Sequence, residues 1–391
     1  MNRVCSIFSQ ILQWFPRAEF EAAVRQHRAE RHARGFSSWG QFIAMLFCQL
    51  GQAKSLREIC GGLASSEGKL RHLGLPEAPA RSTLAYANEH RPWQLYQTVF
   101  EQMLGRCQQL VKAPKGGTGL RFKNKLQSLD ATVIDLCATV FDWAQFRRTK
   151  GAVKLHLLLD HNGHLPSYAV ITPGKTHEIR VARQMRFEPG TVVAFDRGYV
   201  DYDWFAELTR QGVYFVTRLK EGADYGLVEE RTVPERGPVL RDQVIFFYRM
   251  AQEGRECFFR RVEVWNEDQQ EVLVFLTNHL AWAGSTIGAI YKQRWQIELF
   301  FKALKQSLRI KTFVGTSANA LKIQIWSALI AMLILRYLQL KARFGWSLSN
   351  LVALLRQQLF VYRDLWQWLN EPFQAPPAPV LSNDQLELTL A

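Results

Sequence analysis

The stretch LQSLDATVI, residues 126–134, starts a series of short runs rich in aliphatic and β-branched residues. Two more runs follow, GAVKLHLLLD (151–160) and PSYAVIT (166–172). In the former, aliphatic residues alternate with two polar ones, Lys154 and His156. Runs of this kind, bounded by turn-forming residues, are typical of strands. The alternation predicts that Lys154 and His156 share one surface, either a solvated face or a face that contacts a ligand.

The chain then alternates between helices and strands. Its apolar spacing predicts a helix at 178–186, a buried strand at 191–195, a helix at 202–211 and a strand at 213–217. The resulting order, βββαβαβ, indicates a mixed sheet with helices on its faces, which is an α/β fold.

The segments around this block differ in character. Residues 1–110 have helical patterning, whereas residues 219–277 are turn-rich with β-type runs. Two long helices are expected at about 286–310 and 320–341. These limits divide the chain into a helical N-terminal domain (1–110), a sheet domain (120–218 and 278–341), an inserted β subdomain (219–277) and a helical C-terminal segment with a Pro-rich, loosely ordered tail (342–391).

The net charge points to a polyanionic partner. Lys and Arg outnumber Asp and Glu by 49 to 35, giving +14. Such an excess attracts nucleic acid over long range. Residues 106–125 hold six Lys or Arg and no acid, as expected either of a linker running over phosphates or of a solvated loop. No Lys-rich amphipathic helix stands beside an apolar anchor, which argues against a membrane surface.

Membrane insertion and disulfide bonding are not expected. The N-terminus lacks the pattern of a signal peptide, and the longest apolar run, 325–335, is too short to span a bilayer. The six cysteines are scattered without zinc-type spacing, so they are interpreted as reduced thiols. A soluble protein inside the cell is the expectation.

Two aspartates stand where a sheet could use them chemically. Asp130 lies within the first strand run, where a carboxylate is normally disfavoured. Asp196 ends the apolar run TVVAF (191–195), and ligands collect at the carboxyl ends of strands in α/β sheets. Either aspartate alone is more often a turn or cap residue than a catalytic one.

The helix around Glu298 carries a more specific signal. At 100° per residue, Tyr291, Arg294, Glu298 and Lys305 fall within about 60° of arc. Lys302 flanks this face, and an adjoining apolar stripe is suited to packing on a sheet, consisting of Ile297, Phe301, Leu304 and Leu308. Six basic residues and one acid occupy 291–311, so a salt-bridged solvent face is a poor explanation for Glu298.

Together the three carboxylates suggest a metal site. Asp130, Asp196 and Glu298 offer the hard oxygen ligands that Mg²⁺ prefers, with Mn²⁺ as a possible substitute. Two such ions stabilise both the attacking and the leaving oxygen of a phosphoryl displacement. The hypothesis is phosphodiester cleavage or transfer.

The spacing Tyr291-x₂-Arg294-x₃-Glu298-x₆-Lys305 resembles the Y-R-E-K signature of bacterial insertion-sequence transposases. Four further segments are similar to that family, namely the strand that carries Asp130, Asp196–Tyr199, Lys150–His156 and Thr217–Lys220. The resemblance covers roughly residues 120–335. In the N-terminal part no sharp motif is present, although its helical character is similar to the accessory domain of such enzymes.

This resemblance implies an RNase H-like catalytic domain with a β insertion before the Glu helix. Asp130, Asp196 and Glu298 then become the DDE triad with two Mg²⁺ ions. The implied DNA contacts are Tyr291, Arg294, Lys302, Lys305, Arg197, Lys154, Arg218 and Lys220. The partners implied are the terminal inverted repeats of the element, target DNA and a second copy of the chain in the DNA complex. The implied location is the bacterial cytoplasm, at the nucleoid.

Several alternatives stay open on the sequence. The chain could be a domesticated DNA-binding protein that lost cutting, or an RNase H-like nuclease that does not transpose. In related transposases an aromatic residue of the insertion can hold a flipped base, and Trp265 is the nearest candidate. An ordinary β-sheet aromatic is the commoner explanation for Trp265.

Overall fold

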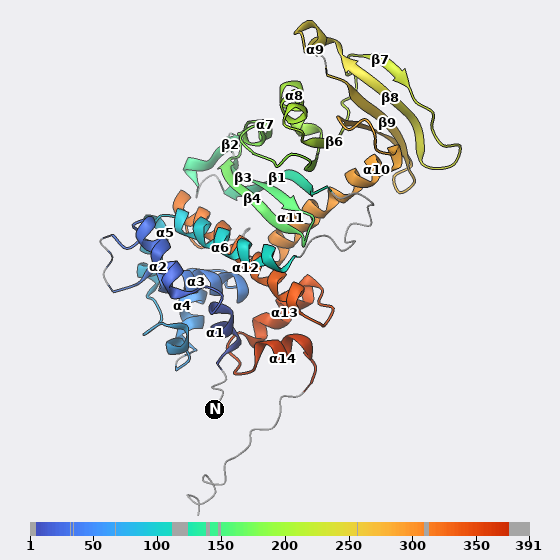
Figure 1. Cartoon of the computed structure of the whole chain (residues 1–391). Helices are drawn as coiled ribbons and strands as arrows, with labels where there is room; N and C mark the ends of the chain where they lie inside the picture. Colours follow the sequence, from blue (N-terminus) through green and yellow to red (C-terminus); the bar gives the residue numbers. More distant parts are fainter. Residues whose placement is uncertain are drawn as a thin grey trace, which may run out of the picture.

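The computed structural model describes residues 5–31, 33, 35–66, 68–111, 124–137, 141–147, 150–255, 257–308 and 313–374. A helical part holds the N-terminus and the C-terminal helices, and a sheet with flanking helices lies against it (Figure 1). The expected Pro-rich tail falls largely outside the described residues. So do residues 112–123 of the basic segment.

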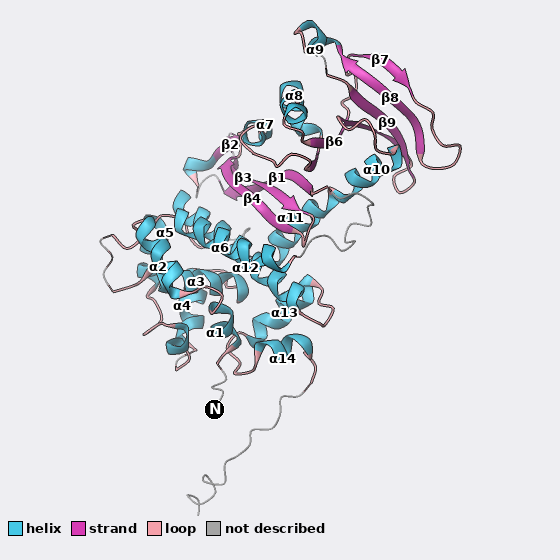
Figure 2. Ribbon diagram, viewed as in Figure 1, coloured by secondary structure: helices cyan, strands magenta, loops and turns pink. Residues whose placement is uncertain are grey.

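Many of the helices lie together in one part of the molecule, and the others accompany the strands (Figure 2). They are α1 (Ile7–Leu12), α2 (Arg17–Gln26), α3 (Ser38–Leu50), α4 (Leu56–Ala64), α5 (Arg81–His90), α6 (Gln94–Leu110), α7 (Glu178–Ala182), α8 (Tyr202–Arg210), α9 (Tyr248–Gln252), α10 (Gly284–Gln293), α11 (Trp295–Ser307), α12 (Ala318–Lys341), α13 (Leu348–Gln358) and α14 (Leu365–Asn370). Short 3₁₀ turns are η1 (Leu70–Leu73), η2 (Asp142–Ala144) and η3 (Arg197–Tyr199).

The strands lie between them. They are β1 (Leu126–Cys137), β2 (Gln145–Arg147), β3 (Lys150–Asp160), β4 (Leu165–Pro173), β5 (Val192–Phe195), β6 (Tyr214–Arg218), β7 (Tyr225–Glu230), β8 (Val239–Phe247), β9 (Phe259–Asn266) and β10 (Glu271–Thr277). The predicted order βββαβαβ is confirmed, with the short β2 added.

The central strands form the expected mixed sheet. Strand β3 pairs antiparallel with both β1 and β4, whereas β5 runs parallel to β1 and β6 runs parallel to β5. Three antiparallel strands followed by two parallel ones, joined through α7 and α8, make an RNase H-like sheet. The predicted fold class is therefore confirmed.

The β-rich insertion continues this sheet. Strand β10 pairs antiparallel with β6, and β9, β8 and β7 follow in turn. The insertion thus shares backbone hydrogen bonds with the core. These bonds fix its starting position relative to the end of β6.

Helices cover both faces of the central sheet, and this corrects the expectation for β3. Leu155 and Leu157 face a core shared with α6 and α12, while α7 and α8 cover the opposite face. His156 is fully buried on that second face, and its Nε2 lies 2.9 Å from Thr172 Oγ1. The prediction of a solvated or ligand-contacting surface at His156 was wrong, because a second helical layer covers the polar positions of the strand.

Helix α12 is the centre of the helical part. It is buried along most of its length and shares one apolar core with the N-terminal helices and with α13 and α14. Its length and apolarity would suit a membrane span, but 83% of its most apolar window is buried inside the protein. In this structure α12 is therefore a core helix.

The basic segment begins later than the sequence indicated. Helix α6 continues to Leu110, so residues 106–110 are helical rather than part of a linker. Cys107 is fully buried, and Arg106 pairs with Glu19 at 2.7 Å. Residues 106–110 stay helical because they pack against the core, whereas the basic composition of the segment had indicated a linker or loop.

A buried histidine at the amino end of β1 makes a pH test of this core possible. His161 Nε2 lies 2.7 Å from Ser128 Oγ, Nδ1 has no partner, and burial, followed by the charge of His164, lowers the pKa of His161 to about 4. Asp160 and Lys125 pair nearby.

We expect acidification to destabilise the protein through His161. The depressed pKa means that His161 contributes stability above pH 6.5, and this contribution is lost as pH falls towards 4. The loss should amount to about 2–3 kcal/mol. Urea unfolding of wild type and His161→Gln between pH 7 and 4.5 measures it. An equal pH slope in both proteins would contradict the assignment.

Candidate active site

The sheet brings Asp130 and Asp196 side by side. The parallel pairing of β1 and β5 ends at Leu129 and Phe195, and the next residue on each strand is an aspartate. Adjacent parallel strands place such residues at one edge of the sheet. Asp196 Oδ1 accepts a hydrogen bond from Gly198 N at 2.9 Å, and Thr217 Oγ1 on β6 donates to the Asp196 carbonyl oxygen at 3.2 Å. The turn after β5 therefore holds the carboxylate at the strand end.

Glu298 reaches the same edge from helix α11. The predicted long helix is two segments, α10 and α11, which meet at Arg294. Around this residue the hydrogen bonds run from Arg294 N to the Tyr291 carbonyl and from Ile297 N to the Arg294 carbonyl, an i→i+3 pattern. The turn is tightened where the active-site side chains project. As expected, Ile297, Phe301, Leu304 and Leu308 are buried.

Arg294 connects two of the three carboxylates. Its Nη1 lies 3.3 Å from Asp130 Oδ2, and its Nη2 lies 2.5 Å from Glu298 Oε1. Only 13% of the Arg294 side chain is exposed, and the guanidinium also lies 5.4 Å from the centre of the Tyr291 ring. Arg294 therefore acts as an internal counter-ion in this structure.

The carboxylates sit in an environment that opposes their charge. Burial is the largest cause that raises the pKa of Asp130, to about 7, against the hydrogen bond from Ala131 N and the charge of Arg294. Burial also raises the pKa of Asp196, and the charges of Glu178 and Glu298 add to the effect. A bound cation would favour the ionised form of both aspartates. A cation at this site would therefore stabilise the two carboxylates in their charged form.

The donor set suits a hard divalent ion. Asp130, Asp196 and Glu298 supply only carboxylate oxygens, the ligands of Mg²⁺ and Mn²⁺. In the part of the chain that the structure describes, no three His, Cys, Asp or Glu side chains lie close enough together to form a preorganised metal site. Arg294 stands between Asp130 and Glu298 instead. Metal entry would require Arg294 to release these two carboxylates.

Two other residues of the Glu298 face, Tyr291 and Lys305, contact different strands of the sheet, β10 and β1. Lys305 Nζ donates to the Val133 carbonyl oxygen at 2.9 Å, and Tyr291 packs on Phe275 with ring centres 5.0 Å apart. Lys302 is exposed. Thus Tyr291, Arg294 and Lys305 all contact residues of the sheet, although the helical spacing assigned the sheet contact to the adjoining apolar stripe.

The other basic residues predicted to contact DNA differ in their surroundings. Lys154 is mostly buried and donates to Glu178 Oε1 at 2.9 Å. Arg197 pairs with Glu221 at 3.4 Å, and Arg218 pairs more distantly with Glu271.

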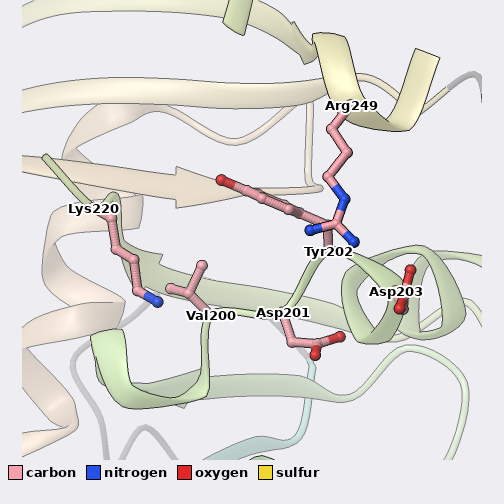
Figure 3. Close-up of a pocket in the computed structure, with 6 residues that line it drawn as sticks. All are labelled: Val200, Asp201, Tyr202, Asp203, Lys220 and Arg249. Atoms are coloured by element: carbon pink, nitrogen blue, oxygen red, sulfur yellow. The ribbon is translucent and has the colours of Figure 1, made fainter. Parts of the chain in front are cut away.

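Lys220 is exposed and lines a cavity of about 290 Å³ after strand β6. Figure 3 shows its amine and the Arg249 guanidinium on two sides of this cavity, with Tyr202 between them. Arg249 comes from α9 of the insertion. The cavity therefore places a cation of the insertion near one that follows the core sheet.

Two features of the site were missed from the sequence. Glu178 was expected to start a helix rather than to bind metal, although its charge reaches Asp196. Trp295, next to Arg294, is 55% exposed although it begins the buried helix α11. A carboxylate in the first turn of the helix that follows the third predicted strand was the available signal for Glu178, whereas helical periodicity gave no signal for Trp295.

Comparison with known proteins agrees with this geometry. A family model described as a transposase DDE domain matches residues 121–334, more than half of the chain. A second model, described as a domain of unknown function, matches residues 4–76.

Individual relatives carry transposase names. A putative transposase of Sinorhizobium fredii is 29% identical over 79% of this chain and 85% of its own length. A probable insertion-sequence transposase of Geobacillus stearothermophilus is 26% identical over 68% of this chain and 70% of its own. The insertion-sequence IS4 transposase of Escherichia coli is 22% identical over 48% of this chain and 44% of its own.

Among solved structures, a piggyBac transposase synaptic complex with hairpin DNA has a TM-score of 0.44 and 10% identity over 99% of this chain and 85% of that chain, too distant to bear on the site. The DDE match spans β1, β5 and α11, the three elements that gather Asp130, Asp196 and Glu298 at one sheet edge. On these grounds the chain belongs to the DDE transposases of bacterial insertion sequences, enzymes that cleave and transfer DNA strands.

Proposed function

We propose that this transposase acts on the terminal inverted repeats of its own insertion sequence, with Asp130, Asp196 and Glu298 as the catalytic triad. The observation that carries this proposal is the meeting of Asp130 on β1 and Asp196 at the end of β5 with a helix glutamate, Glu298, that is joined to Asp130 through Arg294. These three carboxylates would hold two Mg²⁺ ions, and Mn²⁺ would substitute.

The reaction places distinct demands on the side chains. When bound, the ions would activate the attacking oxygen and neutralise the leaving one. Asp130 and Asp196 must be ionised for this, although burial raises the pKa of each. Arg294, once released from Asp130 and Glu298, offers a planar fork to a DNA phosphate. Arg294 would thus exchange the carboxylates of Asp130 and Glu298 for a DNA phosphate when DNA and metal bind.

DNA binding would spread outward from this centre. We propose that Tyr291, Lys302 and Lys305 contact the strand at the element's end. Four further residues would guide the backbone, namely Lys154 within β3 and Arg197, Arg218 and Lys220 at or after the ends of β5 and β6. Lys302 and Lys220 are exposed, so both could reach a phosphate without rearrangement. Lys154 and Arg197 would first leave Glu178 and Glu221.

The assembly would contain two chains, because joining both ends of an element to target DNA requires two triads. The helical residues 1–110 and the basic segment after them would add DNA affinity through phosphate contacts. The enzyme would work at the nucleoid in the bacterial cytoplasm. Light scattering with and without end DNA tests the dimer, and a one-to-one complex that joins both ends would exclude it.

Metal dependence provides the direct test of the proposed reaction. Full-length protein with a labelled element end should cleave at the end in Mg²⁺ or Mn²⁺ and stop in excess chelator, because carboxylate oxygens bind these ions. A target plasmid in the same reaction should receive the cut end. Cleavage undiminished in chelator would contradict the metal site, and cleavage without joining would favour a nuclease.

A further inference from the structure

A fourth carboxylate, Glu178, lies beside Asp196 but outside the triad. Glu178 begins α7, and its Oε1 accepts a hydrogen bond from Lys154 Nζ at 2.9 Å. A Cβ atom added to Gly198 would lie 3.0 Å from Glu178 Oε2 and 3.1 Å from Asp196 Oδ1. These two carboxylate oxygens therefore lie no more than about 6 Å apart. Only glycine at position 198 leaves the space between them open.

A buried hydroxyl without a partner lies among the same charges. Tyr199 is 1% exposed, and its hydroxyl has no hydrogen-bond partner. Burial raises the pKa of Tyr199, and the charges of Asp130, Glu178 and Asp196 raise it further. A buried donor of this kind is usually satisfied by a protein acceptor or an ordered water. Water bound to an ion at the carboxylates would donate a hydrogen bond to this hydroxyl oxygen.

We propose that Glu178 belongs to the metal site as a fourth carboxylate, which holds an ion at Asp196 through a bound water. This inference rests on the proposed function, since it adds a residue to the same site. Mg²⁺ keeps several of its waters when proteins bind it, so a carboxylate about 6 Å from a first ligand can act through one of them. Glu178 is in this sense a positioning residue.

Lys154 gives this arrangement a counter-ion when no metal is bound. It is 15% exposed, and it donates to Glu178 Oε1 and to the Thr176 carbonyl oxygen. The pair fixes the position of the Glu178 carboxylate. Removing Lys154 would leave the Glu178 charge without its partner, which favours a divalent cation. A purely structural salt bridge predicts instead that either substitution has the same effect.

Manganese binding to the full-length protein, followed by electron paramagnetic resonance of free Mn²⁺, tests the inference. We expect Glu178→Gln to weaken the binding of one ion about tenfold, the range typical of residues that act on a metal through another group. Lys154→Gln should bind Mn²⁺ at least as tightly as wild type. Glu188→Gln is the matched control, because this glutamate is 81% exposed and lies before β5, at the opposite end from Asp196. Thermal melts without metal check the fold of each variant.

The possible outcomes separate the inference from the function on which it rests. If Glu178→Gln binds Mn²⁺ like Glu188→Gln while Asp196→Asn loses binding, Glu178 has no part in the metal site. If Glu178→Gln and Lys154→Gln weaken Mn²⁺ binding equally, the pair is only a structural salt bridge, and the inference is also overturned. If Asp196→Asn retains wild-type binding, the proposed triad itself fails.

Discussion

Replacing Asp196 by Asn is expected to reduce strand cleavage at least about a thousandfold, which corresponds to about 4 kcal/mol of lost transition-state stabilisation. Asp196 stands at the end of β5 with its Oδ1 fixed by Gly198 N, so the amide oxygen of Asn would keep this contact while its NH2 group replaces the second carboxylate oxygen. The amide also lacks the charge that holds a divalent ion. Single-turnover cleavage of a labelled element end measures the effect.

Binding of the same DNA should persist in this variant. Losing a negative charge near the phosphates leaves DNA affinity unchanged or slightly higher, because binding depends mainly on cations. Asp268→Asn is the matched control, since this aspartate is 78% exposed in the insertion and pairs with the exposed Lys292. Wild-type cleavage by Asp196→Asn, or equal losses in both variants, would remove Asp196 from the triad.

The central sheet could be predicted because its signals are local. Short aliphatic runs, turn residues and apolar helical spacing determine the order βββαβαβ, and strand-end aspartates mark its reactive edge. The shared face of Tyr291, Arg294 and Glu298 likewise follows from helical geometry alone. These features depend on residues near one another in the chain.

Other features could not be predicted because they depend on contacts distant in sequence. Arg294 bonds to Asp130, 164 residues earlier, and no local pattern records that contact. His156 is polar and alternates with leucines, which indicates a solvated face, yet helices cover both sides of β3. The end of α6 was misplaced for the same reason, since Cys107 packs into a core that charge patterning does not report.

The position of α12 leads to a prediction about the N-terminal helices. A fragment of residues 120–391 should fail to fold cooperatively, because α12 is covered by α3, α5 and α6 and shares their apolar core. Without residues 1–110, a long apolar helix surface would face water, which favours aggregation. Circular dichroism melts and size-exclusion chromatography of the fragment and the full chain measure this.

A single substitution in the intact chain tests the same dependence. Ile330→Asp, at a fully buried position of α12, should destabilise the protein by about 4 kcal/mol or more, because it buries an unpaired charge. Leu340→Asp, at a position of the same helix that is 41% exposed, should cost far less. A fragment that melts cooperatively near the full-chain temperature would show that the two parts fold independently. If the fragment fails to fold, a deletion removes the fold together with the DNA contacts. The contribution of the N-terminal helices to DNA affinity then has to be measured with surface Lys→Ala and Arg→Ala variants of the whole protein.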